Sequence, residues 1–182
     1  MKRIIKSMTS EHKEKALNLV EKVFEDYENA DEAKVVRNLV EEIRSKRFYI
    51  PELELIMVDE TDEVIGFAMF SKFHLEGNYE NELLILTPVA VKTELQRQHI
   101  SKELIEYGFV KGKELGYKAV IVEGNPQNYR ARGFKTSADY GIFADESVGL
   151  PAAECLMVKE LEKNALERIK GIVNYDDYES LK

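Results

Sequence analysis

Two apolar runs joined by one helical segment place the strongest constraint on the fold of this chain. Residues 83–91 and 117–122 are strand-like, and residues 98–115 between them have the length and pattern of a helix. Two strands of one sheet that are joined through a helix run parallel, and the connection is a crossover. Pro88 lies inside the first run and lacks a ladder donor, so we expect strand pairing to fail or bulge there.

Further strands and helices are predicted on both sides of this unit. The apolar faces of two early helices consist of Ala16, Leu17, Val20, Val23, Phe24 and Tyr27, and of Val36, Leu39, Val40 and Ile43. Strand-like segments cover residues 3–8, 53–58, 64–73, 154–158 and 171–175, and a shorter one begins at Phe134. This order predicts a mixed α/β fold, an α+β sandwich whose central sheet is mostly antiparallel and flanked by helices. We expect a single domain over residues 1–182, with 161–182 as a C-terminal extension of it.

Gly108, Gly112 and Gly116 recur every four residues in the helix that joins the two runs. In a membrane this spacing favours helix dimerisation, but charged residues interrupt the pattern. We therefore expect the helix to pack closely against the sheet, and Gly116 to cap its C-terminus.

Composition excludes several classes of function. A formal net charge of −8 argues against a nucleic-acid partner. No apolar run approaches the roughly 18–20 residues needed to cross a bilayer, and residues 1–6 return to charge too soon for a signal peptide. The single cysteine, Cys155, cannot form an internal disulfide. We therefore expect a cytoplasmic protein without a membrane partner. No metal site is expected either, because the histidines lack ligand spacing with Cys155.

The connection between residues 91 and 104 has the chemistry of an anion site. A strand ends and a helix begins there, and the free N–H groups of the first helical turn, with the helix dipole, favour an anion such as a diphosphate. Arg97 and Lys102 can add positive charge. If the strand splays at Pro88, its outward backbone groups can pair with an extended amide such as a pantetheine arm. The segment is therefore suited to both halves of coenzyme A.

The same residues resemble the GNAT acetyltransferases. That family carries a strand ending in a Val-x-Val-like pair, followed by Gln/Arg-x-x-Gly-x-Gly/Ala at the start of a helix. Val89-Ala90-Val91 stands in the first place here, and residues 96–101 stand in the second. The Pro-Val-Ala-Val strand ahead of a Leu-Gln pair is similar to the YhbS-like subgroup. Residues 129–134, Tyr-Arg-Ala-Arg-Gly-Phe, are similar to the family's Tyr-x-x-x-Gly-Phe, and the resemblance covers roughly residues 53–158.

The resemblance implies a GNAT fold and an N-acetyltransferase, in which a primary amine of a small molecule or a protein attacks the thioester of acetyl-CoA. The residues that would bind acetyl-CoA are Val89, Ala90, Val91, Gln96, Arg97, Gln98, His99, Ile100, Ser101, Lys102 and Asn125. Asn125 can instead serve only to form its Gly-Asn-Pro turn. Tyr129 matches the family's general-acid tyrosine. Glu82, at the start of the central strand, and Glu123, at the end of the next strand, are candidate general bases, although a water chain can replace them.

Two positions that are usually small in the family, mostly glycine, are His99 and Ser101 here. His99 adds a ring where the backbone normally closes on phosphate, so it either points away, lends a donor to a phosphate, or obstructs the cofactor. The alternative hypothesis is therefore a degenerate fold that acts as a coenzyme A-binding or interaction module without turnover. This alternative differs from the enzyme in predicting no acetyl transfer to any amine.

The C-terminal residues 175–179 are also open to two interpretations. They form either a frayed acidic end or a segment that folds back beside the acceptor site. The sequence does not specify the acceptor, and it leaves both a monomer and a homodimer open.

Overall fold

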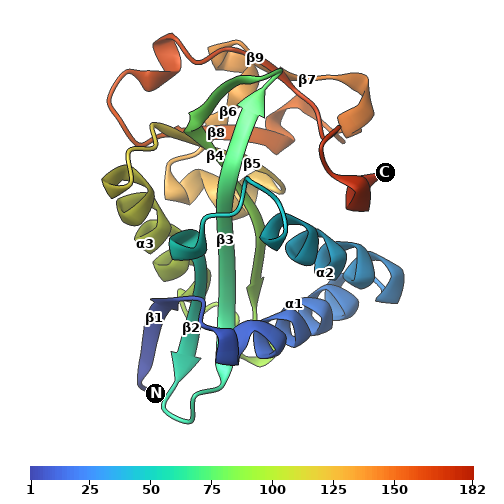
Figure 1. Ribbon diagram of the computed structural model, residues 1–182, viewed down its shortest axis with the longest axis vertical. Coiled ribbons are helices and arrows are strands. Elements are labelled where there is room, and N and C mark those ends of the chain that lie inside the picture. The colour runs from blue at the N-terminus through green and yellow to red at the C-terminus, as the bar shows by residue number, and fades with distance from the viewer. The chain divides into compact units, whose positions relative to one another are not determined.

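The computed structural model describes residues 1–182 (Figure 1). The α-helices are α1 Lys13–Tyr27, α2 Ala30–Arg44, α3 Ile100–Glu114 and α4 Pro126–Tyr129. The strands are β1 Arg3–Ser7, β2 Glu54–Asp59, β3 Val64–Leu75, β4 Asn78–Val91, β5 Ala119–Glu123, β6 Lys135–Thr136, β7 Ile142–Ala144, β8 Leu156–Glu160 and β9 Gly171–Val173. Short 3₁₀ turns join several of them and include η3 Thr93–Leu95, which follows β4, and η9 Glu179–Leu181 at the C-terminus. None of the helices has the length and apolar character that crossing a membrane requires.

Seven strands form one mixed sheet in the order β1-β2-β3-β4-β5-β8-β6. β1 and β2 are antiparallel, as are β2 and β3, whereas β4 and β5 are parallel and joined through α3. The predicted fold and its parallel crossover are therefore confirmed. The ladder between β4 and β5 pairs Leu83–Ile85 with Ala119–Ile121 and so lies upstream of Pro88, which has no N–H to donate. β7 and β9 form a separate parallel pair, and β7 was not predicted from the sequence.

The chain divides into two compact units, and β3, β4 and α3 each contribute to both. The first unit comprises residues 1–71, 87–108 and 178–182, and the second comprises residues 72–86 and 109–177. That the whole chain acts as a single domain stays a prediction.

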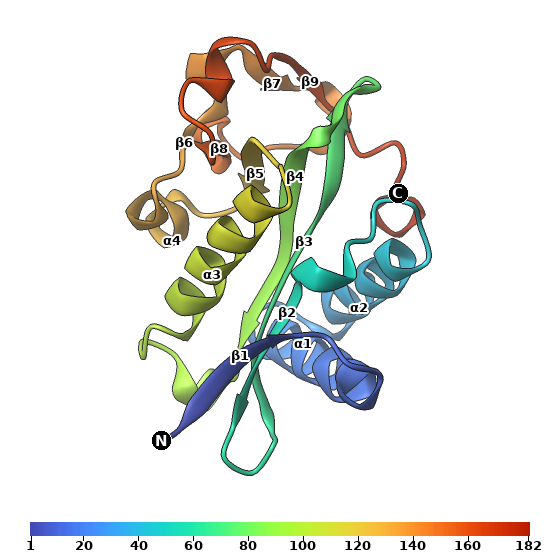
Figure 2. The same cartoon turned by 60° about the vertical axis from the view of Figure 1, so that its left-hand side comes forward.

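In the first unit, α1 and α2 lie side by side (Figure 1 and Figure 2). The predicted apolar face of α1 is buried at Ala16, Leu17, Val20 and Val23. The prediction for Tyr27 is wrong, because this residue is 63% exposed. It ends the helix, and its hydroxyl donates a hydrogen bond to the Gln96 side chain instead of packing in the core.

The helical glycines pack as predicted. A Cβ on Gly108 would lie 2.0 Å from the Phe70 ring, so only glycine allows this close approach. Gly116 has φ +97, and the N–H of Tyr117 donates to the carbonyl of Gly112 at 3.0 Å. This is the geometry of a glycine C-cap, and it confirms the role predicted for Gly116.

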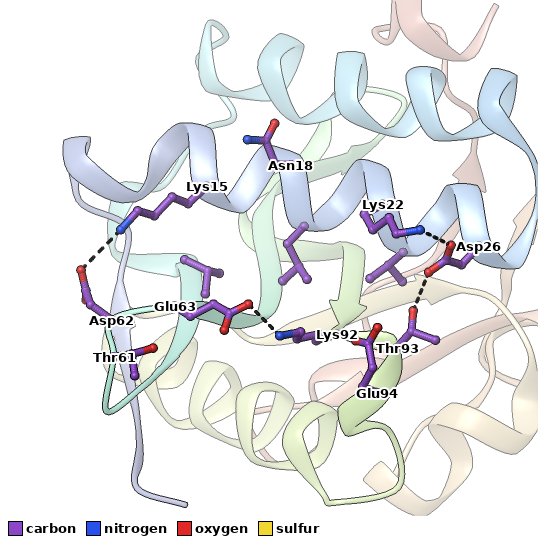
Figure 3. A pocket seen from close by; sticks show the side chains of 13 residues that line it. Lys15, Asn18, Lys22, Asp26, Thr61, Asp62, Glu63, Lys92, Thr93 and Glu94 are labelled. Carbon is purple, nitrogen blue, oxygen red and sulfur yellow. Dashed lines mark hydrogen bonds and ion pairs between the residues drawn. The ribbon is translucent and has the colours of Figure 1, made fainter.

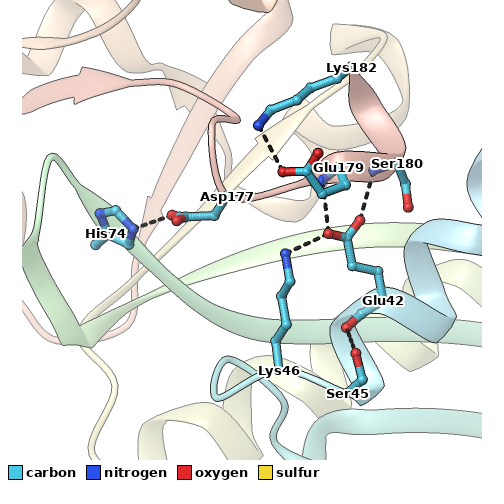
Figure 4. Close-up of polar contacts among 8 residues, drawn as sticks. All are labelled: Glu42, Ser45, Lys46, His74, Asp177, Glu179, Ser180 and Lys182. Carbon is cyan, nitrogen blue, oxygen red and sulfur yellow. Dashed lines mark hydrogen bonds and ion pairs between the residues drawn. The ribbon is translucent and has the colours of Figure 1, made fainter.

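The C-terminal segment is docked, so the interpretation as a frayed end is wrong. In the first unit, Tyr178 is 3% exposed, and the N–H groups of Glu179 and Ser180 donate to the carboxylate of Glu42 at 2.8 and 2.9 Å. In the second unit, Asp177 pairs with the His74 ring at 2.6 Å. Figure 4 shows both sets of contacts. Residues near a chain end stay ordered when apolar burial and hydrogen bonds hold them, as they do here.

Candidate active site

The connection from β4 to α3 adopts an unusual backbone conformation. Arg97 and His99 both have φ of 64, in the left-handed region. This conformation costs a non-glycine residue about 1–2 kcal/mol, which explains why glycine is common at the position of His99. Arg97, Gln98 and His99 are exposed. Because the His99 ring makes no hydrogen bond within the protein, it remains available to a ligand or to solvent.

The first turn of α3 presents free backbone donors. Its first intrahelical hydrogen bond runs from the N–H of Glu103 to the carbonyl of His99 at 3.0 Å. The N–H groups of Ile100, Ser101 and Lys102 therefore lack an acceptor in the helix. The side chains of Arg97 and Lys102 are exposed and form no ion pair. This combination of N–H donors and free cations fits the chemistry of a diphosphate.

Three side chains outside the turn hold it in place. The Tyr27 hydroxyl donates to the Gln96 side chain, and the Thr93 hydroxyl donates to Asp26 at 2.9 Å. From β1, a guanidinium N–H of Arg3 donates to the Gln98 carbonyl at 2.9 Å. Residues in left-handed conformations persist only where the surroundings restrain them, and these bonds supply that restraint.

A groove of about 580 Å³ lies between α1, the β2–β3 turn and the residues that follow β4 (Figure 3). Ion pairs join its charged side chains: Lys92 with Glu63 at 2.7 Å, and Lys15 with Asp62 at 3.7 Å. Most charged side chains of the groove are therefore paired with one another. These pairs link the residues that line the groove and leave few of its charges free for a ligand.

The three predicted strand residues alternate in burial at the end of β4. Ala90 is buried, whereas Val89 and Val91 are half-buried. This is the alternation of a strand with one covered face. The predicted cofactor residues from Val89 to Lys102 thus lie together on one strand end, one turn and one helix start, all within the first unit.

In the second unit, Tyr129 ends the short helix α4 and is half-buried. Its ring contacts Phe134 edge-on, with centroids 5.8 Å apart. It also lies over Gly124, where a Cβ would approach the ring to 2.8 Å. Burial raises the pKa of the Tyr129 hydroxyl to about 12. The group therefore remains protonated at neutral pH, and the hydroxyl makes no hydrogen bond within the protein.

The two candidate bases differ in their surroundings. Glu123 is exposed at the end of β5 and accepts a hydrogen bond from the Tyr175 hydroxyl at 2.7 Å. Glu82 forms a two-bond ion pair with Arg168 at 2.5 and 3.0 Å, which holds the pKa of Glu82 below its ordinary value. A carboxylate with a lowered pKa accepts a proton less readily at neutral pH.

The two carboxylates also lie at opposite ends of β5. The carbonyl of Glu82 accepts from the N–H of Lys118, just before β5, at 2.7 Å. Glu123 ends that strand, and Gly124, beneath Tyr129, follows it directly. At about 3.3 Å a residue, the strand separates the two backbones by roughly 16 Å. The second unit therefore brings Glu123 near Tyr129 and leaves Glu82 apart from them.

Asn125 acts in the turn that joins β5 to α4. Its side-chain oxygen accepts from the N–H of Gln127 at 3.0 Å, as an N-cap does. Arg3 was not identified as a site residue from the sequence, and Tyr175 was noted only as part of the C-terminal segment that could fold back beside the acceptor site. No motif surrounds either residue, and their contacts come from distant parts of the chain.

Residues 15–137 match the model of the Acetyltransferase (GNAT) family. The chain belongs to this family. It is 29% identical over 153 residues to the uncharacterized N-acetyltransferase YhbS of Escherichia coli K12, covering 84% of this chain and 85% of that protein. Membership confirms the predicted class of enzyme, an N-acetyltransferase.

The fold is similar to two solved structures of the same family. One is GNAT family N-acetyltransferase YhbS from Escherichia coli in complex with CoA, with a TM-score of 0.83 and 24% identity over 97% of this chain and 91% of that one. The other is a GNAT family acetyltransferase from Brucella melitensis in complex with acetyl-CoA, with a TM-score of 0.72 and 20% identity over 100% and 99% of the two chains. These similarities confirm the predicted GNAT fold.

Proposed function

We propose that this protein transfers the acetyl group of acetyl-CoA to a primary amine of a small molecule or a protein, and that the turn before α3 holds the diphosphate of the cofactor. The observation that carries the proposal is the set of free N–H groups at Ile100, Ser101 and Lys102, beside the unpaired side chains of Arg97 and Lys102. Backbone N–H groups of this kind bind phosphate oxygens whatever side chain clears the site. The His99 side chain is exposed, so it would leave these N–H donors uncovered.

The end of β4 would hold the extended part of the cofactor. Val89, Ala90 and Val91 continue the strand beyond the residues that pair with β5. Backbone groups on such a strand can bond to the amides of a pantetheine arm, as one strand bonds to another. Gln96 and Gln98 would act by shaping the turn, since Gln96 is held by Tyr27 and Gln98 by Arg3. When bound, acetyl-CoA supplies a thioester that an amine can attack.

Tyr129 is the proposed general acid. Like any tyrosine, it holds its proton across the neutral range, where a departing thiolate needs one, and burial moves its pKa further upward, to about 12. The hydroxyl has no hydrogen-bond partner in the protein, so it is free to bond to a ligand. The edge contact with Phe134 and the close approach of Gly124 fix the position of the ring.

Glu123 is the proposed proton acceptor for the attacking amine. It is exposed, it lies one residue before the glycine beneath Tyr129, and the Tyr175 hydroxyl orients its carboxylate. Glu82 is the weaker candidate because its ion pair with Arg168 lowers its pKa and so its tendency to accept a proton. Asn125 supports the site by capping α4 and so positioning the helix that carries Tyr129.

The experiment is a thiol-release assay with acetyl-CoA and a panel of amines, combined with calorimetry of coenzyme A binding. We expect saturable binding, and turnover with at least one amine. Tyr129→Phe should lower kcat by about 10²-fold or more, as loss of an acid group does. Tyr107→Phe, an exposed tyrosine on α3, is the matched control and should retain activity.

The outcomes separate the two hypotheses. Binding of coenzyme A without turnover across the panel would favour the degenerate module over the enzyme. Absence of any calorimetric signal with saturating acetyl-CoA would refute the cofactor site itself. The cytoplasmic location and the state of a monomer or homodimer stay proposals, and cell fractionation and light scattering test them.

A further inference from the structure

Arg3 lies on β1, away from the residues that the family motif contains, yet it contacts the proposed diphosphate turn. One guanidinium nitrogen donates to the carbonyl of Gln98 at 2.9 Å and to the carboxylate of Glu103 at 2.8 Å. Its side chain is 21% exposed. Two hydrogen bonds to different partners restrict the rotamers of the Arg3 side chain and fix its position.

The bond to Gln98 orients a donor of the turn. The carbonyl of Gln98 and the N–H of His99 belong to one planar peptide unit, and in a trans unit they point in opposite directions. By holding the carbonyl toward β1, Arg3 turns the His99 N–H away from β1. His99 is also one of the two residues in this turn with φ of 64, so this peptide needs restraint to keep its orientation.

The bond to Glu103 removes an unfavourable charge. Glu103 lies in the first turn of α3, and a free carboxylate there would repel a bound diphosphate. Pairing with Arg3 at 2.8 Å offsets that charge, so the exposed cations Arg97 and Lys102 dominate the field at the turn. One residue therefore acts both on the shape of the turn and on its electrostatics.

We propose that Arg3 is a positioning residue for the cofactor site, which sets the Gln98–His99 peptide and neutralises Glu103 so that the turn accepts a diphosphate. The inference rests on the proposed function, because it presumes that the turn binds coenzyme A. Arg3 itself need not touch the ligand.

The test is calorimetric titration with coenzyme A of the full chain and of Arg3→Ala, Glu103→Gln and the double variant. We expect Arg3→Ala to weaken binding about tenfold, in line with a charge-assisted bond. Glu103→Gln in the Arg3→Ala background should recover part of the loss, because the unpaired charge is gone. In turnover, Arg3→Ala should raise KM for acetyl-CoA and leave kcat within about twofold.

Two controls separate this role from a general effect. Lys6→Ala removes the same charge from the same strand, where Lys6 makes only a 4.0 Å ion pair with Asp62, and should leave the affinity for coenzyme A unchanged. Arg3→Lys keeps the charge but loses the planar guanidinium with its several N–H donors, and should give an intermediate Kd for coenzyme A. Unchanged binding in Arg3→Ala, or an equal loss in Lys6→Ala, would overturn the inference. If the unmodified protein fails to bind coenzyme A, the proposed function fails instead.

Discussion

Glu42 offers a quantitative test of how the C-terminus is held. Its side chain is 11% exposed, and its carboxylate accepts hydrogen bonds from the N–H groups of Glu179 and Ser180 and pairs with Lys46 at 2.5 Å (Figure 4). Glu42, from α2, thus bonds to the first N–H groups of the C-terminal turn η9, as the side chain of an N-cap residue does. We predict that Glu42→Gln destabilises the protein, because glutamine has no charge and only one acceptor oxygen.

The magnitude follows from the pKa. Burial acts to raise the pKa of Glu42, but the bonds from Lys46, Ser180 and Glu179 outweigh it and lower the pKa from 4.5 to about 2. A folded-state pKa below the unfolded value means that the stabilisation is present above pH 4.5 and is lost as the pH falls toward 2. At 1.36 kcal/mol per pKa unit, the linkage contributes at most about 3 kcal/mol at pH 7. Since glutamine retains one acceptor, we expect a cost of about 1–3 kcal/mol.

The assay is urea unfolding of the unmodified protein and of Glu42→Gln at a series of pH values. The difference in free energy of unfolding should be largest near pH 7 and shrink progressively below pH 4.5. Glu41→Gln, one position away and more exposed, is the matched control and should cost less than about 1 kcal/mol. A difference below 0.5 kcal/mol at pH 7 (about the scatter of surface substitutions), or one that does not shrink in acid, would refute the reasoning.

Three further predictions test other parts of the structure. His99→Gly should raise the free energy of unfolding by up to about 1 kcal/mol because it relieves a φ of 64, whereas His99→Ala should not; equal effects in urea unfolding would contradict the strain argument. Gly108→Ala should lower the free energy of unfolding by about 1–3 kcal/mol in the same assay, since its Cβ would lie 2.0 Å from Phe70. Gly112→Ala, whose Cβ would lie 3.0 Å from Leu84, should lower it less. Asn125→Ala should lower stability by about 1 kcal/mol through loss of the cap, and an unchanged melting temperature would argue against that role.

The sequence predicted those features that depend on neighbouring residues. Apolar spacing located α1, α2 and α3 and most strands of the main sheet to within a few residues, because periodicity reports directly which face is buried. The turn between β4 and α3 was located for a similar reason, since the end of a strand and the start of a helix are both local features. That this turn binds a diphosphate stays a prediction. The glycines of α3 were predicted correctly for a similar reason, because helical spacing puts them on one face.

What the sequence missed depends on residues that are far apart in the chain. Arg3 and Gln98 are separated by 95 residues, and Tyr175 and Glu123 by 52. Strand β7 has only three residues, and its partner β9 lies well beyond it, so no local pattern marks the pair. Glu82 and Glu123 were both expected near the cleft, yet the parallel register of β4 and β5 places them at opposite ends of β5.

The sequence by itself determined the family, the mixed fold and the segment that is suited to coenzyme A, since all three rest on local order and spacing. Only the tertiary structure decided that Tyr27 faces outward, that the C-terminus is docked on Glu42, and that Arg3 reaches the turn. The physical reason is that local propensity chooses the elements, whereas hydrogen bonds between distant side chains depend on how those elements pack. Such bonds are the ones that shape the strand-to-helix connection on which the proposed activity depends.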